Sequence, residues 1–112
     1  MILQTVLSEL NPYVYVVGSF ARGKEYDDSD IDLYIRRYED EDGIEQTYTS
    51  KIIEVLDRLK VSWDSDFIDS LGVRLDRFID LSTWFSMPEI LEPFDIEVCG
   101  VKMQAVLNIE KN

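Results

Sequence analysis

A tight Gly-Ser turn lies between two strand-like segments in residues 13–35, and this stretch limits the possible folds more than any other part of the chain. Residues 13–17 are β-branched or aromatic and indicate a strand, so Gly18 and Ser19 come where that strand ends and the chain turns. Such a turn directs backbone N–H groups and a hydroxyl toward a phosphate. The stretch therefore predicts a phosphate-binding turn at the end of a strand.

Two aspartates begin the next apolar segment. Asp30 and Asp32 alternate with apolar residues in a segment, residues 30–36, that indicates a second strand. Side chains two positions apart on a strand point to the same face, so we expect both carboxylates on one side. Adjacent carboxylates are ligands that Mg²⁺ accepts. A phosphate-binding turn facing a metal site predicts chemistry on a nucleoside triphosphate, because positioning and charge neutralisation supply most of that catalysis.

The stretch from Gly18 to Ile35 resembles the Gly-Ser…Asp-x-Asp signature of the nucleotidyltransferases related to DNA polymerase beta. Its Gly-Ser-x-Ala-Arg-Gly and Ser-Asp-Ile-Asp-Leu segments are most similar to the minimal nucleotidyltransferase (MNT) branch. The strict resemblance covers about fifteen residues and is fairly specific, because a strand, a Gly-Ser turn, Gly23 and an acidic pair must follow in that order. In a chain with 23 acidic residues an Asp-x-Asp pair alone is uninformative, and a Gly-Ser pair alone is an ordinary turn.

The resemblance implies a mechanism in which three acidic residues hold two Mg²⁺ ions. An acceptor hydroxyl then attacks the α-phosphorus of the nucleotide and pyrophosphate leaves. Asp30 and Asp32 correspond to the first two of these acids.

The third carboxylate has three candidates. In residues 71–76 every second residue is apolar, and the segment ends in an acid. This pattern is similar to the family's and favours Asp76. Asp80 lies four residues further on, on the same strand face, and a bulge between the two would exchange their roles. Asp64 is the remaining candidate. The third acid can also act as the general base for the incoming hydroxyl.

The loop after the first strand supplies the expected nucleotide contacts. Ser19 is expected to contact the β- or γ-phosphate, and Gly18 lets the backbone turn and approach closely. Arg22 is the expected cation for the triphosphate, with an ion pair to an acidic side chain of the same loop as the alternative. Gly23 gives the loop its freedom.

Length and charge narrow the class of partner. The 112 residues predict a single domain over residues 1–112. A formal net charge of −12, from 23 acidic and 11 basic residues, argues against direct binding to nucleic acid, which rests on basic side chains. A Mg²⁺-nucleotide and a basic protein partner remain compatible with this charge.

Missing residue types exclude further classes of site. The chain has no histidine, which excludes imidazole zinc sites and Ser-His triads, and its lone Cys99 cannot form an internal disulfide. No signal peptide or long apolar run is present, so we expect a cytoplasmic protein without a membrane segment.

The apolar pattern predicts an α/β (α+β) fold of the polymerase-beta type, with helices packed on a small mixed sheet of three to five strands. Helices are expected within residues 1–10 and 45–60 and as a short piece ending at Gly72. Strands are expected over residues 13–17, 30–36, 73–81 and 94–98. Residues 38–43 are expected to form an acidic loop able to close over a ligand. Residues 82–93 fit a loop or a short helix, and residues 103–109 fit a strand or a helix.

The resemblance implies a function. MNT proteins of this size resemble the antitoxin half of modules in which the partner is a helical HEPN ribonuclease and AMP is placed on its tyrosine. The chain is therefore expected to be a protein adenylyltransferase of a toxin–antitoxin system that moves AMP from Mg-ATP to a hydroxyl of such a partner.

Two other functions stay open. The first is a catalytically inactive module of the same fold that regulates a partner by contact. The second is nucleotidyl transfer to a small molecule, for which a partner subunit or a homo-oligomer would complete the pocket.

Overall fold

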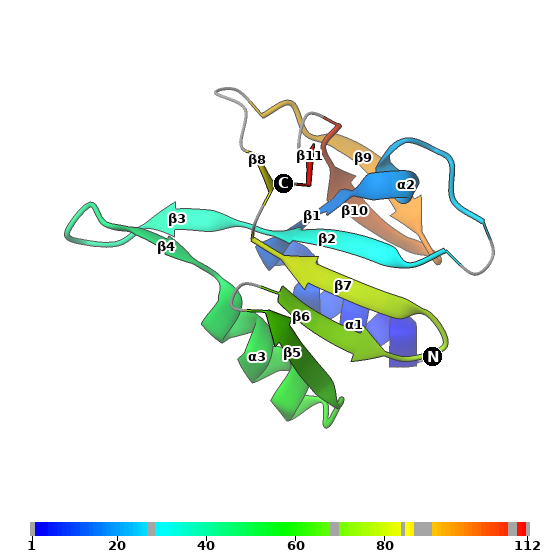
Figure 1. Ribbon diagram of the computed structural model, residues 1–112, viewed down its shortest axis with the longest axis horizontal. Coiled ribbons are helices and arrows are strands. Elements are labelled where there is room, and N and C mark those ends of the chain that lie inside the picture. Colours follow the sequence, from blue (N-terminus) through cyan, green and yellow to red (C-terminus); the bar gives the residue numbers. More distant parts are fainter. Residues whose placement is uncertain are drawn as a thin grey trace.

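The protein is built on one mixed sheet of seven strands in the computed structural model (Figure 1). The structure describes residues 2–26, 29–67, 70–83, 85–86, 91–107 and 110–111. The strands of the sheet are β1 (Val14–Val17), β2 (Ile31–Ile35), β5 (Trp63–Phe67), β6 (Ser70–Arg74), β7 (Phe78–Ser82), β9 (Phe94–Val98) and β10 (Val101–Ala105). Their order is β5-β6-β7-β2-β1-β10-β9, in which β2 is parallel to β7 and β1 to β10. The expected α/β fold is confirmed, with a larger sheet than predicted.

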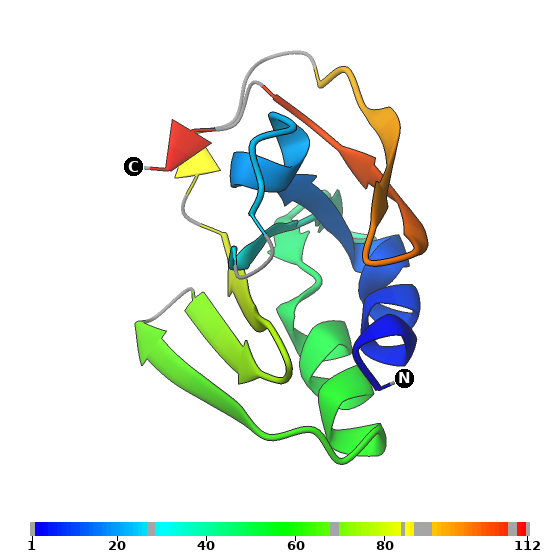
Figure 2. The same cartoon turned by 90° about the vertical axis from the view of Figure 1, so that its right-hand side faces the viewer.

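Two helices, α1 (Ile2–Leu10) and α3 (Thr49–Arg58), lie side by side on one face of the sheet (Figure 2). A surface ion pair of 3.2 Å joins Arg58 to Glu9 between them. The helix predicted within residues 1–10 is confirmed. The helix predicted over residues 45–60 begins only at Thr49, because the residues before it form a strand. The buried residues of both helices are Leu3, Val6, Leu7, Leu10, Ile52, Val55 and Leu56.

The two faces of the central strands differ in chemistry. Ile31, Leu33 and Ile35 of β2 are fully buried in the core that the two helices cover. Because strand side chains alternate, Asp32 and Tyr34 point to the opposite face. One face of β2 therefore holds the core, and the other holds the polar residues of interest.

A hairpin replaces the single strand predicted over residues 73–81. β6 and β7 are antiparallel neighbours, paired from Ser70↔Ser82 to Arg74↔Phe78, and residues 75–77 form the turn between them. The prediction failed because apolar alternation continues on both sides of a turn that has no glycine or proline. Asp76 consequently lies in the turn, and not on a strand face with Asp80.

The helical piece predicted before Gly72 is also wrong. The chain there forms the end of β5 and the beginning of β6, which are antiparallel with an irregular register. Ile68, which falls within the predicted piece, lies outside the described residues. Cross-strand pairing has overridden a short apolar spacing that fits a helix and a strand equally well.

The acidic segment predicted as a loop over residues 38–43 belongs to a two-stranded ribbon, β3 (Arg37–Glu39) and β4 (Glu45–Thr47), which projects from the body of the protein (Figure 1). Asp40 holds its turn, because its carboxylate accepts the backbone N–H groups of Asp42 and Ile44, both at 2.9 Å. The Ile44 N–H holds the pKa of the Asp40 carboxyl below its usual range.

The C-terminal part adds a further hairpin to the sheet. The strand predicted over residues 94–98 is confirmed as β9, and its partner β10 ends at Ala105, which assigns a strand to the first part of the ambiguous segment 103–109. Within the segment predicted as loop or short helix over residues 82–93, β8 (Phe85–Ser86) pairs with β11 (Glu110–Lys111), and residues 84 and 87–90 lie outside the described part. Among the helices that the structure describes, none has the length and apolar composition needed to span a bilayer.

The Asp40 turn gives a first prediction. In Asp40→Ala the amides of Asp42 and Ile44 should exchange with solvent about tenfold faster, because each loses its acceptor. The matched control is Glu41→Ala, which removes an exposed acid from the same turn, and hydrogen exchange measured by NMR compares the two. Equal acceleration in both variants would contradict the assigned role. Because the pKa is lowered in the folded chain, protection in the unmodified protein should persist into mild acid and disappear only as the pH falls through that lowered pKa.

Candidate active site

Three strand ends meet at one edge of the sheet, at the right of Figure 1. β1 and β2 are antiparallel and β2 and β7 are parallel, so the end of β1 lies beside the beginnings of β2 and β7. The Gly-Ser turn, the acidic pair and the β6–β7 turn are therefore brought together by topology.

The chain turns sharply at Gly18, which begins the one-turn helix α2 (Gly18–Ala21). Gly18 has a φ of 70°, in the left-handed region that favours glycine. A Cβ at this position would collide with Asp32 Oδ2 and lie 3.1 Å from Asp32 Cγ. The backbone of the turn thus packs directly against the Asp32 carboxylate. Ser19, the next residue, is half-buried in the first turn of α2, where helix N–H groups have no intrahelical acceptor.

Asp32 and Asp80 occupy neighbouring positions on parallel strands. They are register partners between β2 and β7, which places their Cα atoms about 4.8 Å apart on one face. Both are half-buried. Ser70 on β6 donates its hydroxyl to Asp80 Oδ1 at 3.3 Å. Asp30 is exposed one residue before β2, and strand alternation puts it on the same face as Asp32.

The structure places the other two candidate acids away from this pair. Asp76 is exposed in the β6–β7 turn. Asp64 is exposed on β5, where it pairs with Gly72 of β6. A Cβ at Gly72 would come within 2.8 Å of Phe78 Cζ, so the Phe78 ring fills the space over Gly72. This ring lies between Asp64 and Asp80.

The basic residue of the loop is exposed. Arg22 caps the C-terminal end of α2, and it forms no ion pair with any residue that the structure describes. Gly23 follows with a φ of 67°, and a Cβ there would meet no atom within 4 Å. The loop is thus open to solvent at the positions expected to face the triphosphate.

Apolar packing closes the face beyond Asp32. Tyr34 is two residues along β2 and fully buried, where it packs with Val17 and Val106. Burial raises the pKa of the Tyr34 phenol, so it stays protonated at neutral pH. The accessible part of the site therefore lies toward the sheet edge that carries Gly18 and Asp30.

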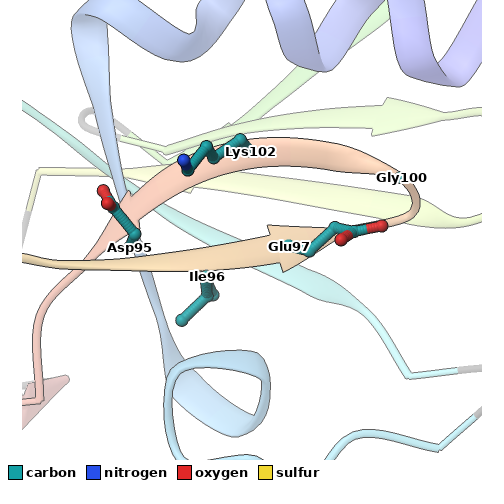
Figure 3. Close-up of a pocket in the computed structure, with 5 residues that line it drawn as sticks. All are labelled: Asp95, Ile96, Glu97, Gly100 and Lys102. Carbon is teal, nitrogen blue, oxygen red and sulfur yellow. The ribbon is translucent and has the colours of Figure 1, made fainter.

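A cavity of about 430 Å³ lies elsewhere, on the β9–β10 hairpin (Figure 3). Ile96 points to the opposite side of this hairpin from Asp95. None of the predicted site residues lines the cavity, and we do not assign it to the site. Its lining residues are Asp95, Ile96, Glu97, Gly100 and Lys102.

The family model for the nucleotidyltransferase domain matches residues 2–94 of the chain, which include α1, the Gly18 turn and both Asp32 and Asp80. The chain belongs to the nucleotidyltransferase domain family. Membership implies nucleotidyltransferase activity with a nucleotide substrate, and the family generally uses a divalent metal ion. Comparison with curated proteins and with solved structures gave no significant match.

The donor set of this nucleotidyltransferase domain fits a divalent metal ion. Carboxylate oxygens are the hard ligands that Mg²⁺ prefers, and Asp32 and Asp80 present two of them from adjacent strands. In the part of the chain that the structure describes, no three acidic or cysteine side chains are already gathered around one point. Asp30 is the further carboxylate on this face.

Sequence reasoning missed two residues of the site, namely Ser70 and Phe78. Each acts through cross-strand neighbours in the β6–β7 hairpin, which the sequence pattern presented as one strand. Correct assignment of the turn at residues 75–77 would have placed Ser70 and Phe78 beside Asp80.

The Gly18 contact gives a second prediction. Gly18→Ala should be less stable than Gly23→Ala by about 1–3 kcal/mol, because both substitutions strain a left-handed backbone but only the first overlaps a carboxylate. Chemical denaturation measures the difference. Equal free energies of unfolding for the two variants would show that the turn does not pack on Asp32.

Proposed function

We propose that this nucleotidyltransferase domain moves AMP from Mg-ATP to a hydroxyl of a partner protein, as a protein adenylyltransferase of the MNT antitoxin type. One observation supports the site most strongly: the Gly18 turn packs on the Asp32 carboxylate, and Asp80 is the register partner of Asp32. A turn suited to phosphate oxygens thus adjoins a pair of metal-binding carboxylates.

Asp30, Asp32 and Asp80 would hold two Mg²⁺ ions. When bound, the metal supplies charge neutralisation for the triphosphate and lowers the pKa of the acceptor hydroxyl. In the transfer, the hydroxyl oxygen bonds to the α-phosphorus and the bond from that phosphorus to the pyrophosphate oxygen breaks. Asp80 is the proposed acceptor of the hydroxyl proton, since a general base must lie within hydrogen-bond reach.

Asp80 is a better third carboxylate than Asp76 or Asp64. Asp80 is half-buried beside Asp32 and accepts a hydrogen bond from Ser70, which fixes one of its oxygens. Asp76 is in a turn four residues away, and Asp64 is separated from Asp80 by the Phe78 ring over Gly72. We therefore propose Asp80, the alternative predicted from the sequence, as the third carboxylate in place of Asp76, the first choice.

The triphosphate would bind along the Gly18 turn. The Ser19 hydroxyl and the N–H groups at the start of α2 would contact the β- or γ-phosphate. Arg22 is exposed at the end of α2 and would add a positive charge, while Gly23 keeps the loop backbone close to the ligand. ATP is the proposed nucleotide because the chain resembles the MNT branch.

The proposed partner is a basic, helical protein of the HEPN type that presents a tyrosine hydroxyl. A net charge of −12 favours a fast encounter with a basic protein and disfavours direct binding to nucleic acid. We place this reaction in the cytoplasm. A homo-oligomer is compatible with the proposal.

The experiment that tests this function incubates the protein with α-labelled ATP, Mg²⁺ and proteins that co-purify with it. Asp32→Asn and Asp80→Asn should each reduce label transfer by about 100-fold or more, because each removes a metal ligand or the base. Asp30→Asn is expected to act in the same direction. Asp76→Asn and Asp64→Asn remove the same charge elsewhere and should leave transfer within about threefold of the unmodified chain.

The outcomes separate the competing assignments. Loss of transfer in Asp76→Asn with retention in Asp80→Asn would restore Asp76 as the third carboxylate. If no label moves but both the unmodified chain and Asp32→Asn still restrain the partner, the protein is a non-catalytic binding module.

A further inference from the structure

Arg77 connects three separate parts of the edge that carries the site. Its Nη2 group donates to the backbone carbonyl of Tyr26, in the loop that follows α2. Its Nη1 group donates to Cys99 Sγ at 3.5 Å, in the β9–β10 turn. Its guanidinium carbon lies 5.1 Å from the centre of the Phe20 ring in α2. One side chain from the β6–β7 turn therefore contacts the loop, α2 and the last hairpin.

The contacts of Arg77 lie on the core side of the sheet. Phe20 is buried in the main core, and Cys99 packs against it. Asp32 and Asp80 point to the opposite face, as strand alternation requires. Arg77 therefore contacts the loop from the core side of the sheet, and the carboxylates lie on the other side.

We propose that Arg77 is a positioning residue that holds the loop from Arg22 to Tyr26 in the conformation that binds the triphosphate. This inference rests on the proposed function, because it assigns the loop to nucleotide binding. The Arg22 side chain is exposed, and a Cβ at Gly23 would meet no atom within 4 Å. The backbone hydrogen bonds of residues 22–24 run only to α2, so the contact from Arg77 links the loop to a different element. The Tyr26 carbonyl that accepts this contact lies three residues beyond Gly23.

An arginine is suited to this position for a geometric reason. Its planar fork has several N–H donors and binds two acceptors at once while its face lies over an aromatic ring. A lysine presents its three N–H donors from a single nitrogen and has no planar face, so it does not match the separated positions of the Tyr26 carbonyl, the Cys99 sulfur and the Phe20 ring. Arg77→Lys is therefore expected to retain only part of the anchoring.

The test compares Arg77→Met and Arg77→Lys with Arg58→Met in the full chain. Arg58→Met is the matched control, since it removes the same charge from a surface ion pair on α3. Hydrogen exchange is followed in peptides that cover residues 19–26 without nucleotide, and the Kd for Mg-ATP is measured by calorimetry. Chemical denaturation reports global stability in the same samples.

In Arg77→Met we expect exchange of the 19–26 peptides to rise about tenfold and the Kd for Mg-ATP to rise about tenfold, with the β2 and β7 peptides still protected. Arg77→Lys should give intermediate values, and Arg58→Met should match the unmodified chain. Unchanged loop protection in Arg77→Met overturns the inference. Equal loss of protection throughout the sheet also overturns it, because that result describes a general structural role.

A second variant and the exchange measurement keep the test decisive if the first variant or nucleotide binding fails. If Arg77→Met does not fold, Phe20→Leu removes the ring under the guanidinium and keeps an apolar side chain in the core, and it should loosen the same peptides. If the unmodified chain binds no Mg-ATP, the proposed function fails and the nucleotide-binding role of Arg77 fails with it. The exchange data then still decide whether Arg77 orders the loop.

Discussion

The register between β1, β2 and β7 is the constraint on which the rest of the structure depends. Val17 pairs with Asp32 and Asp32 pairs with Asp80, so the end of β1 and two carboxylates lie in one row. A slip of one residue in β2 would turn Asp32 into the core and bring Leu33 to the polar face. The fully buried Ile31, Leu33 and Ile35 oppose that slip, since burial of each side chain is worth about 1.5–3 kcal/mol. Hydrophobic burial on one face of the sheet thus fixes the positions of the Asp32 and Asp80 carboxylates on the other face.

Those parts of the fold that depend on neighbours in sequence could be predicted. α1, β1, β2 and β9 each follow from a run whose period is clear, and the Gly18 turn follows from its glycine. The β6–β7 hairpin was not predicted, because residues 75–77 contain no glycine or proline, and their one turn-forming residue, Asp76, also fits the acidic position that ends a strand in the family pattern. The β3–β4 ribbon was hidden for a different reason. Its strands are polar on both sides, and its turn is formed by a carboxylate, Asp40, among other acids.

The residues of the candidate site also fall into a group that the sequence could predict and a group that it could not. Gly18, Asp30 and Asp32 are close in sequence, and their relation could be inferred from a turn and a strand. Asp80 is a neighbour of Asp32 only through the pairing of two strands that are far apart in the chain, and apolar alternation alone favoured Asp76 instead. Register across a sheet is set by the packing of the whole core, and no local pattern encodes it. The supporting contacts from β6 and from the β6–β7 turn were out of reach for this reason.

The attachment of β10 to β1 has a consequence for how the protein can diversify. Val16↔Ala105 is the single register pair between these strands, and the family match ends at residue 94, where β9 begins. Besides this pair and the hydrogen bond from the Val106 N–H to the Val16 carbonyl, the hairpin is held by Met103 and Val98 in the core and by side-chain hydrogen bonds from Gln4 of α1 to the Cys99 carbonyl and from Asn11 to the Lys102 carbonyl. An appendage held in this way can change its outer surface without altering the ladder that orders Asp32. Evolution of a new binding partner could thus change the surface of β9 without moving the strands that position Asp32.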